Sequence, residues 1–173
     1  ITNRISIDQR PEHINDRAVL GHWEGDSMVS KKSPAGLNTL VERKSGLLLV
    51  TKIKNSTKDE TSKAVVRRME KLPRMLRKTL TLDNGHENAG HEYITQKLKT
   101  AVYFAHPYHS WERGTNENTN GLIRRYLPKG TDFATVSKEE VKAIEDRLND
   151  RPRKRLGYKT PREVFNKRGA LKR

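Results

Sequence analysis

The chain of 173 residues contains no cysteine, few aromatic residues and no long hydrophobic run. Without cysteine, disulfide bonds, thiolate metal ligands and thiol catalysis are all excluded. A membrane span is excluded as well, because no apolar run approaches the roughly 20 residues that one needs. The 11 glycines show no regular period, which excludes a collagen-like chain. The lack of cysteine fits a protein of a reducing compartment.

Hydrophobic residues are scarce: they make up 32% of the chain, and 33% of the residues are charged. Such a composition raises the alternative of a disordered chain. Two short apolar runs, LLLV at 47–50 and TLTL at 79–82, argue against disorder, because they are typical of buried strands. The length and these runs together indicate one folded domain.

Positive charge dominates the sequence. There are 36 lysine and arginine residues against 21 acidic residues, a net charge of +15, which favours a polyanionic partner. Ten of the cations, with Glu163 as the single acid, lie in residues 151–173. This basic C-terminal segment is either a solvated tail or a nucleic-acid contact, and we favour the contact because apolar residues are interleaved with the charges.

Hydrophobic periodicity and turn residues predict an α/β order of elements. After an irregular arm at 1–20, three strands are followed by helix, strand, helix, strand, helix and helix. The hairpin of the second and third strands divides at Ser45-Gly46. The expected ranges are strands at 22–30, 37–44, 47–54, 79–85 and 101–107, and helices at 55–73, 91–99, 115–127 and 138–150.

Two acidic residues occupy chemically interesting places in this order. Asp26 lies in the first strand and Asp83 at the end of the fourth. An acid at a strand end escapes burial yet is held by rigid backbone. If the two strands are neighbours, the carboxylates converge and repel unless a cation neutralises them. Oxygen ligands without cysteine suit Mg²⁺ or Mn²⁺.

A third acid, Glu117, follows Asp83 with 33 residues between them, in the first turn of the helix expected at 115–127. Beside it runs a polar stripe with a spacing of four residues, which consists of Asn116, Asn120 and Arg124. Such a face is poor core material. It suits phosphate oxygens and metal-bound water.

Four sequence blocks carry a family resemblance. They are GHWEGD at 21–26, TLDNGHE at 81–87, HPYHSWERGTNENTNGLIRRYLPKG at 106–130 and LNDRPRKRLGYKTPREVF at 148–165. Together they resemble the acid-bearing blocks and the C-terminal signature of bacterial insertion-sequence transposases. The catalytic core of that family is of the DDE, retroviral-integrase-like type.

The resemblance implies a ribonuclease H-like α/β fold, with a central five-stranded mixed sheet of three antiparallel and then two parallel strands and helices on both faces. It implies that Asp26, Asp83 and Glu117 are the catalytic residues and the ligands of two divalent cations, Mg²⁺ or Mn²⁺. Glu24 shares a strand face with Asp26. The family pattern favours Asp26, so we expect Glu24→Gln to retain activity.

The function implied is cleavage of a phosphodiester at the element ends and transfer of the freed 3′-OH into target DNA. The expected partners are double-stranded DNA, both element ends and target, and further copies of the chain in a homo-oligomer. The expected location is the bacterial cytoplasm, on chromosomal or plasmid DNA, with no membrane association. Two alternatives stay open: a basic nucleic-acid-binding domain without catalysis, and a ribonuclease H-like nuclease without strand transfer.

Three regions are expected: the arm at 1–20, a catalytic domain at 21–150 and the basic segment at 151–173. Residues 151–165 are expected to dock on the domain and 166–173 to be mobile. The DNA-binding N-terminal region that the resemblance implies is not among these residues. The residues expected to contact DNA are Trp111, Arg113, Asn116, Asn120, Arg124, Lys129, Arg151, Arg153, Lys154 and Arg155.

Two other chemistries fit the sequence less well. His86 and His91 resemble a zincin helix, but they are five residues apart and so lie roughly 140° apart around a helix, on different faces. A tyrosine recombinase needs a tyrosine nucleophile beside histidine and arginine. Three of the five tyrosines, Tyr93, Tyr103 and Tyr126, lie in expected elements as core or helix-face residues, and we do not expect the cluster that this reaction needs around Tyr108 or Tyr158.

Overall fold

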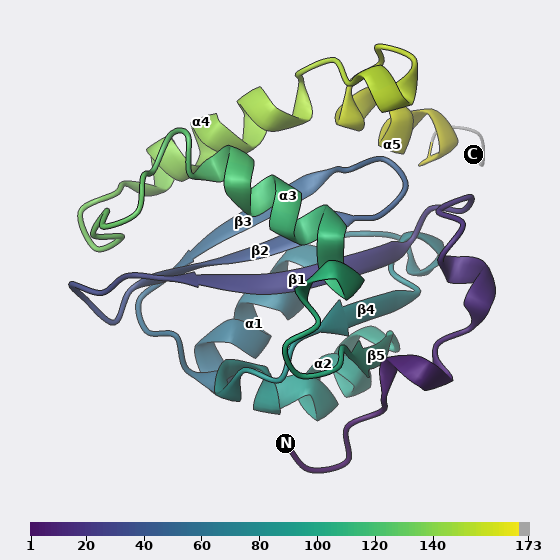
Figure 1. Ribbon diagram of the computed structural model, residues 1–173, viewed down its shortest axis with the longest axis horizontal. Helices are drawn as coiled ribbons and strands as arrows, with labels where there is room; N and C mark the ends of the chain where they lie inside the picture. The colour runs from purple at the N-terminus through teal and green to yellow at the C-terminus, as the bar shows by residue number, and fades with distance from the viewer. Residues whose placement is uncertain (170–173) are drawn as a thin grey trace.

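A five-stranded mixed sheet with helices on both faces forms the centre of the molecule in the computed structural model, which describes residues 1–169 (Figure 1). The strand order is β3-β2-β1-β4-β5. β2 is antiparallel to both of its neighbours, β1 and β3, whereas β1, β4 and β5 are parallel. This arrangement confirms the expected fold class. The strands are β1 (His22–Val29), β2 (Gly36–Glu42), β3 (Leu48–Ile53), β4 (Thr79–Leu82) and β5 (Ala101–Phe104).

The helices follow the predicted order, and a further one, α5, closes the chain. They are α1 (Lys58–Met69), α2 (His91–Leu98), α3 (Gly114–Ile123), α4 (Lys138–Asn149) and α5 (Pro161–Gly169). Local signals fix the ends of two of them. The Thr57 side chain accepts a hydrogen bond from the Glu60 amide at the start of α1, and Ser137 and Glu140 form a capping box on α4. Within residues 1–169, every helix is too short or too polar to cross a bilayer.

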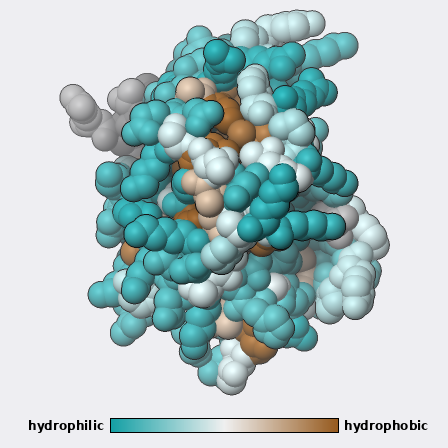
Figure 2. Space-filling view, turned by 90° about the vertical axis from the view of Figure 1, so that its left-hand side faces the viewer, coloured by the Kyte–Doolittle hydropathy of each residue, from teal (hydrophilic) through white to brown (hydrophobic). Residues whose placement is uncertain are grey.

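Strand alternation divides the apolar side chains between two cores. On one face, α1 and α2 pack against residues such as Trp23 and Leu80 of neighbouring strands. On the other face, α3 and α4 cover Met28 and Leu37. Because successive strand residues point to opposite faces, Asp26 lies on the same side as Met28, beneath α3. The surface outside these cores is largely hydrophilic on the face drawn in Figure 2, where apolar areas are small.

Both edges of the sheet are covered. At the β3 edge, the Asn149 side chain of α4 accepts a hydrogen bond from the Leu48 amide and donates one to the Leu48 carbonyl, both at 2.8 Å. Glu145, also of α4, accepts from the Val50 amide at 2.6 Å. At the β5 edge, the Phe104 amide donates to the carbonyl of Ile5 in the N-terminal arm.

The C-terminal segment contacts the domain through an aromatic side chain and through arginines. The Phe165 ring of α5 is 5% exposed and lies edge-on to Trp23, with 5.9 Å between the ring centroids. Arg155 donates a hydrogen bond to the Lys44 carbonyl in the β2–β3 turn. The part expected to be mobile, 166–173, includes the last turn of α5 as far as Gly169, and its end, 170–173, lies outside the described residues.

Candidate active site

Two carboxylates lie side by side on the α3 face of the sheet. β1 and β4 are parallel neighbours, and their register pairs Glu24 with Thr81. Asp26 and Asp83 each come two residues later, so both point to the same face as that pair. The Asp26 side chain is 23% exposed and that of Asp83 is 32% exposed. The strand order therefore brings together two acids that are 57 residues apart in the sequence.

Arg113 joins the two carboxylates. It ends the 3-10 helix η5 (Ser110–Arg113), directly before α3. One terminal nitrogen lies 3.2 Å from Asp26 Oδ1, and the other lies 3.1 Å from Asp83 Oδ2. The first nitrogen also donates to the Gly25 carbonyl at 3.1 Å. Only 12% of the Arg113 side chain is exposed, so the residue expected to contact DNA is here occupied with the acids.

The remaining carboxylate oxygens are held by amides. Asp26 Oδ2 accepts a hydrogen bond from Asn120 Nδ2 at 2.7 Å. Asp83 Oδ1 accepts from Asn88 Nδ2 at 2.6 Å and from the Gly85 amide at 3.0 Å. Burial raises the pKa of the Asp26 carboxyl; the Arg113 charge opposes this rise and the Asp83 charge adds to it. A cation at this place stabilises the ionised pair.

Glu117 stands apart from this pair. It occupies the first turn of α3 and is exposed to solvent. Among the described residues, no three acidic or histidine side chains come close enough together to form a metal cluster. The structure thus brings Asp26 and Asp83 together, whereas Glu117 remains on the helix above them.

Glu24, the other acid of β1 on the same face as Asp26, is fully buried and has a structural role. Its Oε1 accepts a hydrogen bond from Arg43 Nε, and its Oε2 accepts one from the Asn116 amide, both at 2.9 Å. The Asn116 side chain donates to the Glu24 carbonyl at 3.0 Å. An anion that accepts from the first turn of a helix also stabilises the helix dipole. Glu24 and Asn116 therefore fix the beginning of α3 on β1.

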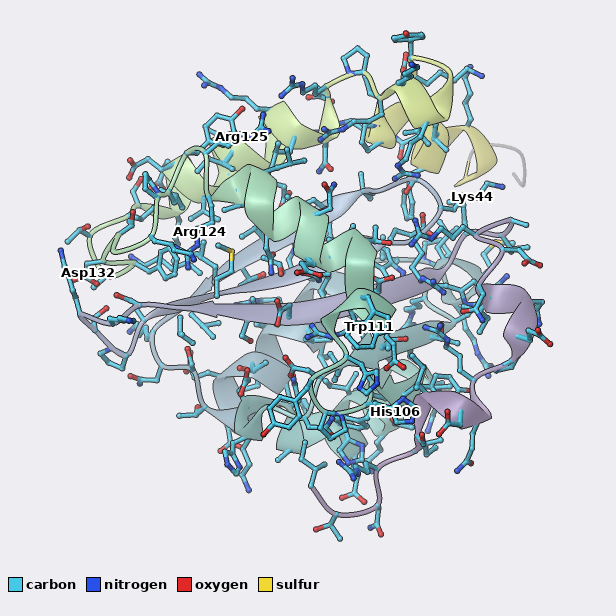
Figure 3. All side chains as sticks on the ribbon, in the orientation of Figure 1. Lys44, His106, Trp111, Arg124, Arg125 and Asp132 are labelled. Atoms are coloured by element: carbon cyan, nitrogen blue, oxygen red, sulfur yellow. The ribbon has the colours of Figure 1, made fainter. Side chains whose placement is uncertain are left out.

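The two asparagines of the polar stripe of α3 face the sheet, whereas Arg124 packs against the segment that follows the helix. Asn116 is fully buried, and Asn120 is half-buried against Asp26. Arg124 lies over the Phe133 ring, 5.3 Å from its centroid, and donates to backbone carbonyls beyond the helix. Its side chain is labelled in Figure 3 at the far end of α3 from Trp111. In this structure, the stripe attaches α3 to the sheet and to the segment that follows the helix.

Two of the expected DNA contacts are open to solvent, one before the start of α3 and one beyond its end. Lys129 is exposed, and so is Trp111, with 68% exposure. The Trp111 ring lies edge-on to His109, 4.4 Å between centroids, in the loop below α3 (Figure 3). An exposed aromatic ring in this position is available to stack on a base.

Three cations of the C-terminal segment line a cavity of about 450 Å³ on the other side of α3. Arg153, Lys154 and Arg155 line it, whereas Arg151 is exposed. Arg17 of the N-terminal arm joins them, which nothing in the sequence indicated. Burial, followed by the charges of Arg17 and Arg153, lowers the pKa of Arg155. This concentration of positive charge suits an anionic ligand.

The sequence also gave no sign of the contacts that support η5. His106 Nδ1 lies 2.8 Å from Glu112 Oε1, and its Nε2 lies 3.0 Å from Asp8 Oδ2 in the arm. The hydrogen bonds to Glu112 and then Asp8 raise the pKa of His106.

Asn88, which orients Asp83, was also not identified from the sequence. The only signal in the sequence was that Asn88 lies close to Asp83.

The chain is similar in sequence to bacterial transposases. It is 44% identical over 165 residues to the transposase for insertion sequence element IS4351 of Bacteroides fragilis, and 43% identical over 165 residues to that for IS1086 of Cupriavidus metallidurans. It is 42% identical over 171 residues to transposase InsI for IS30A of Escherichia coli K12. These alignments cover 95%, 95% and 99% of the chain, but 50%, 49% and 44% of the relatives. The chain thus spans about half the length of these relatives.

Solved structures with the same fold are catalytic cores of retroviral integrases. The core domain of BIV integrase gives a TM-score of 0.66 at 20% identity and covers 87% of this chain and 97% of its own. That of HTLV-2 integrase, in complex with magnesium, gives 0.64 at 22% and covers 85% and 97%. No family model matches the chain. The expected resemblance is confirmed: over almost its whole length this chain is similar to one part of insertion-sequence transposases, and its fold is that of a retroviral integrase catalytic core.

Proposed function

We propose that the chain is the catalytic domain of a DNA transposase, which cuts a phosphodiester at the element ends and joins the freed 3′-OH to target DNA. One observation carries this proposal: Asp26 and Asp83 converge on neighbouring parallel strands of an integrase-type sheet, where they share a cationic partner. The names of the relatives, which are transposases of insertion sequences, support it.

The site fits a hard divalent cation, Mg²⁺ or Mn²⁺. Its donors are carboxylate oxygens, with no thiolate available in the chain, and the partly buried pair attracts positive charge. Asp26 and Asp83 would hold two such ions, with Glu117 as the third carboxylate. When bound, the ions activate the attacking oxygen and stabilise charge on the leaving oxygen. The HTLV-2 integrase core, which shares the fold, was solved in complex with magnesium.

The residues of the chain position the reaction. Asn120 and Asn88 orient the two aspartates through hydrogen bonds of 2.7 and 2.6 Å. Glu24 fixes the beginning of α3, and with it the place of Glu117. Water attacks in the first step and the 3′-OH in the second, so that no side chain forms a covalent intermediate. Positioning of the reacting groups and stabilisation of the charge that develops in the transition state account for most of the rate enhancement.

DNA is the partner that the charge distribution favours. With a net charge of +15, the chain attracts phosphates at long range. Trp111 is exposed two residues before Arg113, Lys129 is exposed beyond the other end of α3, and the cations around the cavity beside α3 extend the proposed contact surface. Two element ends must meet one target, so the active complex contains more than one copy of the chain. We place it on bacterial chromosomal or plasmid DNA in the cytoplasm.

A strand-transfer assay tests the proposal. The full-length transposase and residues 1–173 are each incubated with labelled duplex bearing the element end and with a plasmid target, in Mg²⁺, Mn²⁺ or EDTA. Joined product is expected only with metal. Asp26→Asn, Asp83→Asn and Glu117→Gln should each reduce it by at least about 100-fold, since ligand losses exceed the effects of outer-shell residues.

The matched control is Glu70→Gln, which removes one exposed carboxylate at the end of α1 and should keep full activity. Cleavage without joining would favour the nuclease alternative. DNA binding with no metal-dependent cleavage by the full-length protein would favour the non-catalytic binding domain.

A further inference from the structure

Arg113 lies between the two carboxylates and is mostly buried, although it was expected to contact DNA. Its guanidinium uses both terminal nitrogens, one for Asp26 Oδ1 and one for Asp83 Oδ2. These are the oxygens left over after Asn120 and Asn88 have bound the other oxygen of each carboxylate. Every carboxylate oxygen of the pair therefore has a hydrogen-bond partner. Arg113 contacts one oxygen of each aspartate, and an asparagine contacts the other.

A divalent cation and this guanidinium compete for the same oxygens. Both are positive, and both neutralise the repulsion between the two acids. A metal ion held between Asp26 and Asp83 would draw on the same carboxylate charge as Arg113 and would repel the guanidinium, so the arginine contacts should weaken or break as the metal binds. The cost of breaking two charge-assisted hydrogen bonds is subtracted from the affinity for the metal.

We propose that Arg113 is a placeholder cation: it neutralises Asp26 and Asp83 before metal loading, leaves them when metal binds, and then pairs with a DNA phosphate. This inference rests on the proposed function, because it takes the two aspartates as the metal ligands. It adds that metal loading and DNA binding are coupled through one side chain.

The surroundings of Arg113 suit such an exchange. Its Nε is buried without a hydrogen-bond partner, so the present position leaves one donor unsatisfied. A guanidinium makes two parallel hydrogen bonds equally well to a carboxylate or to a phosphate. The residue lies at the junction of η5 and α3, next to Glu112, whose contact with His106 holds the loop in place. Exposed Trp111 of the same turn already faces solvent.

The exchange makes the binding of metal and the binding of DNA positively cooperative. DNA that attracts Arg113 frees the aspartates and so strengthens metal binding, and by linkage the metal strengthens DNA binding by the same factor. Without DNA, the arginine suppresses loading of the site. The domain would then assemble its metal centre mainly when a substrate phosphate is present.

Mn²⁺ binding to residues 1–173, measured without DNA by electron paramagnetic resonance of the free ion and by calorimetry, tests the placeholder. Arg113→Gln should bind Mn²⁺ about 5- to 150-fold more tightly than the parent, the usual range of coupled sites. Addition of a duplex oligonucleotide should tighten Mn²⁺ binding to the parent and leave the variant unchanged. Metal-free Arg113→Gln should melt below the parent and gain more in melting temperature from Mn²⁺.

Arg125→Gln is the matched control, because it removes the same charge from an exposed residue at the opposite end of α3 (Figure 3). Its Mn²⁺ affinity should stay within about twofold of the parent. Equal or weaker Mn²⁺ binding by Arg113→Gln, with strand transfer intact in the parent, would overturn the placeholder and leave the proposed function standing. Absence of Mn²⁺ binding in the parent and in both variants would overturn both proposals.

Discussion

The carboxylate of Glu24 lies 2.9 Å from Nε of Arg43, and neither side chain is more than 7% exposed. The second oxygen of Glu24 accepts from the Asn116 amide in the first turn of α3. Arg43 in turn donates to the Ile14 carbonyl in the N-terminal arm. One buried ion pair thus connects the arm, the sheet and the helix that carries Glu117.

Breaking this ion pair should be costly. Glu24→Gln leaves Arg43 as an uncompensated buried charge and is expected to lower the free energy of unfolding by about 3–5 kcal/mol. Urea unfolding of the variant and the parent measures the loss. The exposed-acid variant Glu70→Gln should change it by less than about 0.5 kcal/mol. Parental stability of Glu24→Gln would show that the pair does not hold α3; whether the variant retains activity, as we expect, is a separate question for the strand-transfer assay.

Trp111 should matter for DNA and not for folding. Because its ring is 68% exposed, Trp111→Ala is expected to leave the melting temperature within about 2 °C of the parent. Loss of one stacked base should weaken DNA binding by about 1–3 kcal/mol, which fluorescence anisotropy with a labelled duplex measures. The exposed Tyr158→Ala serves as control, with parental affinity expected. A large drop in melting temperature for Trp111→Ala would contradict this view of the loop.

His22 should make the protein less stable in mild acid. Burial, assisted by the charge of Lys78, lowers the pKa of His22 to about 4, and its Nδ1 lies 2.8 Å from Thr79 Oγ1. The unfolded chain takes up this proton below about pH 6.5, whereas the folded chain does so only near pH 4. Stability contributed by the neutral form is therefore lost as the pH falls from 6.5 to 4.

From pH 7 to pH 5 the loss due to His22 should be about 2 kcal/mol, since each pH unit in this window contributes roughly 1.36 kcal/mol. Urea unfolding at both values, compared between the parent and His22→Asn, isolates the contribution. An equal pH dependence in the two proteins would show that His22 is already protonated at pH 5 in the folded state.

Phe165 tests whether α5 is docked. Removal of a ring that is 5% exposed and packed on Trp23 should lower the free energy of unfolding by about 3–5 kcal/mol in Phe165→Ala. The half-buried neighbour in Val164→Ala should cost clearly less. Chemical denaturation of both variants gives the comparison. If the two losses were equally small, the C-terminal segment would be only loosely attached.

The strands and the antiparallel hairpin could be predicted from local signals, whereas the order of the mixed sheet was implied by the family resemblance. Apolar runs mark β3 and β4, and Ser45-Gly46 marks the hairpin turn. The helix of residues 161–169 was missed since its few apolar positions, among them Phe165, are surrounded by charge. Its place depends on a contact with Trp23, far away in the sequence, which no local pattern reveals.

In the site, residue types pointed to Asp26 and Asp83, and strand adjacency brought them together. The partners could not be read from the sequence. Arg113 and Asn116 both looked like DNA contacts, because a polar residue near an acid has the same sequence pattern whether it faces solvent or the acid. Only the packing of α3 on β1 shows that Asn116 is buried and that Arg113 lies between the carboxylates.

The covered edges of the sheet limit how copies of this chain can associate. A free edge strand recruits another strand by backbone pairing. Here the side chains of Asn149 and Glu145 take the amides of Leu48 and Val50, and the arm takes the amide of Phe104. These hydrogen bonds would have to break before a strand of another copy could pair with either edge. Association through side-chain surfaces of helices and loops would keep them, so copies of the domain could join and separate without any change in the backbone that holds the acids.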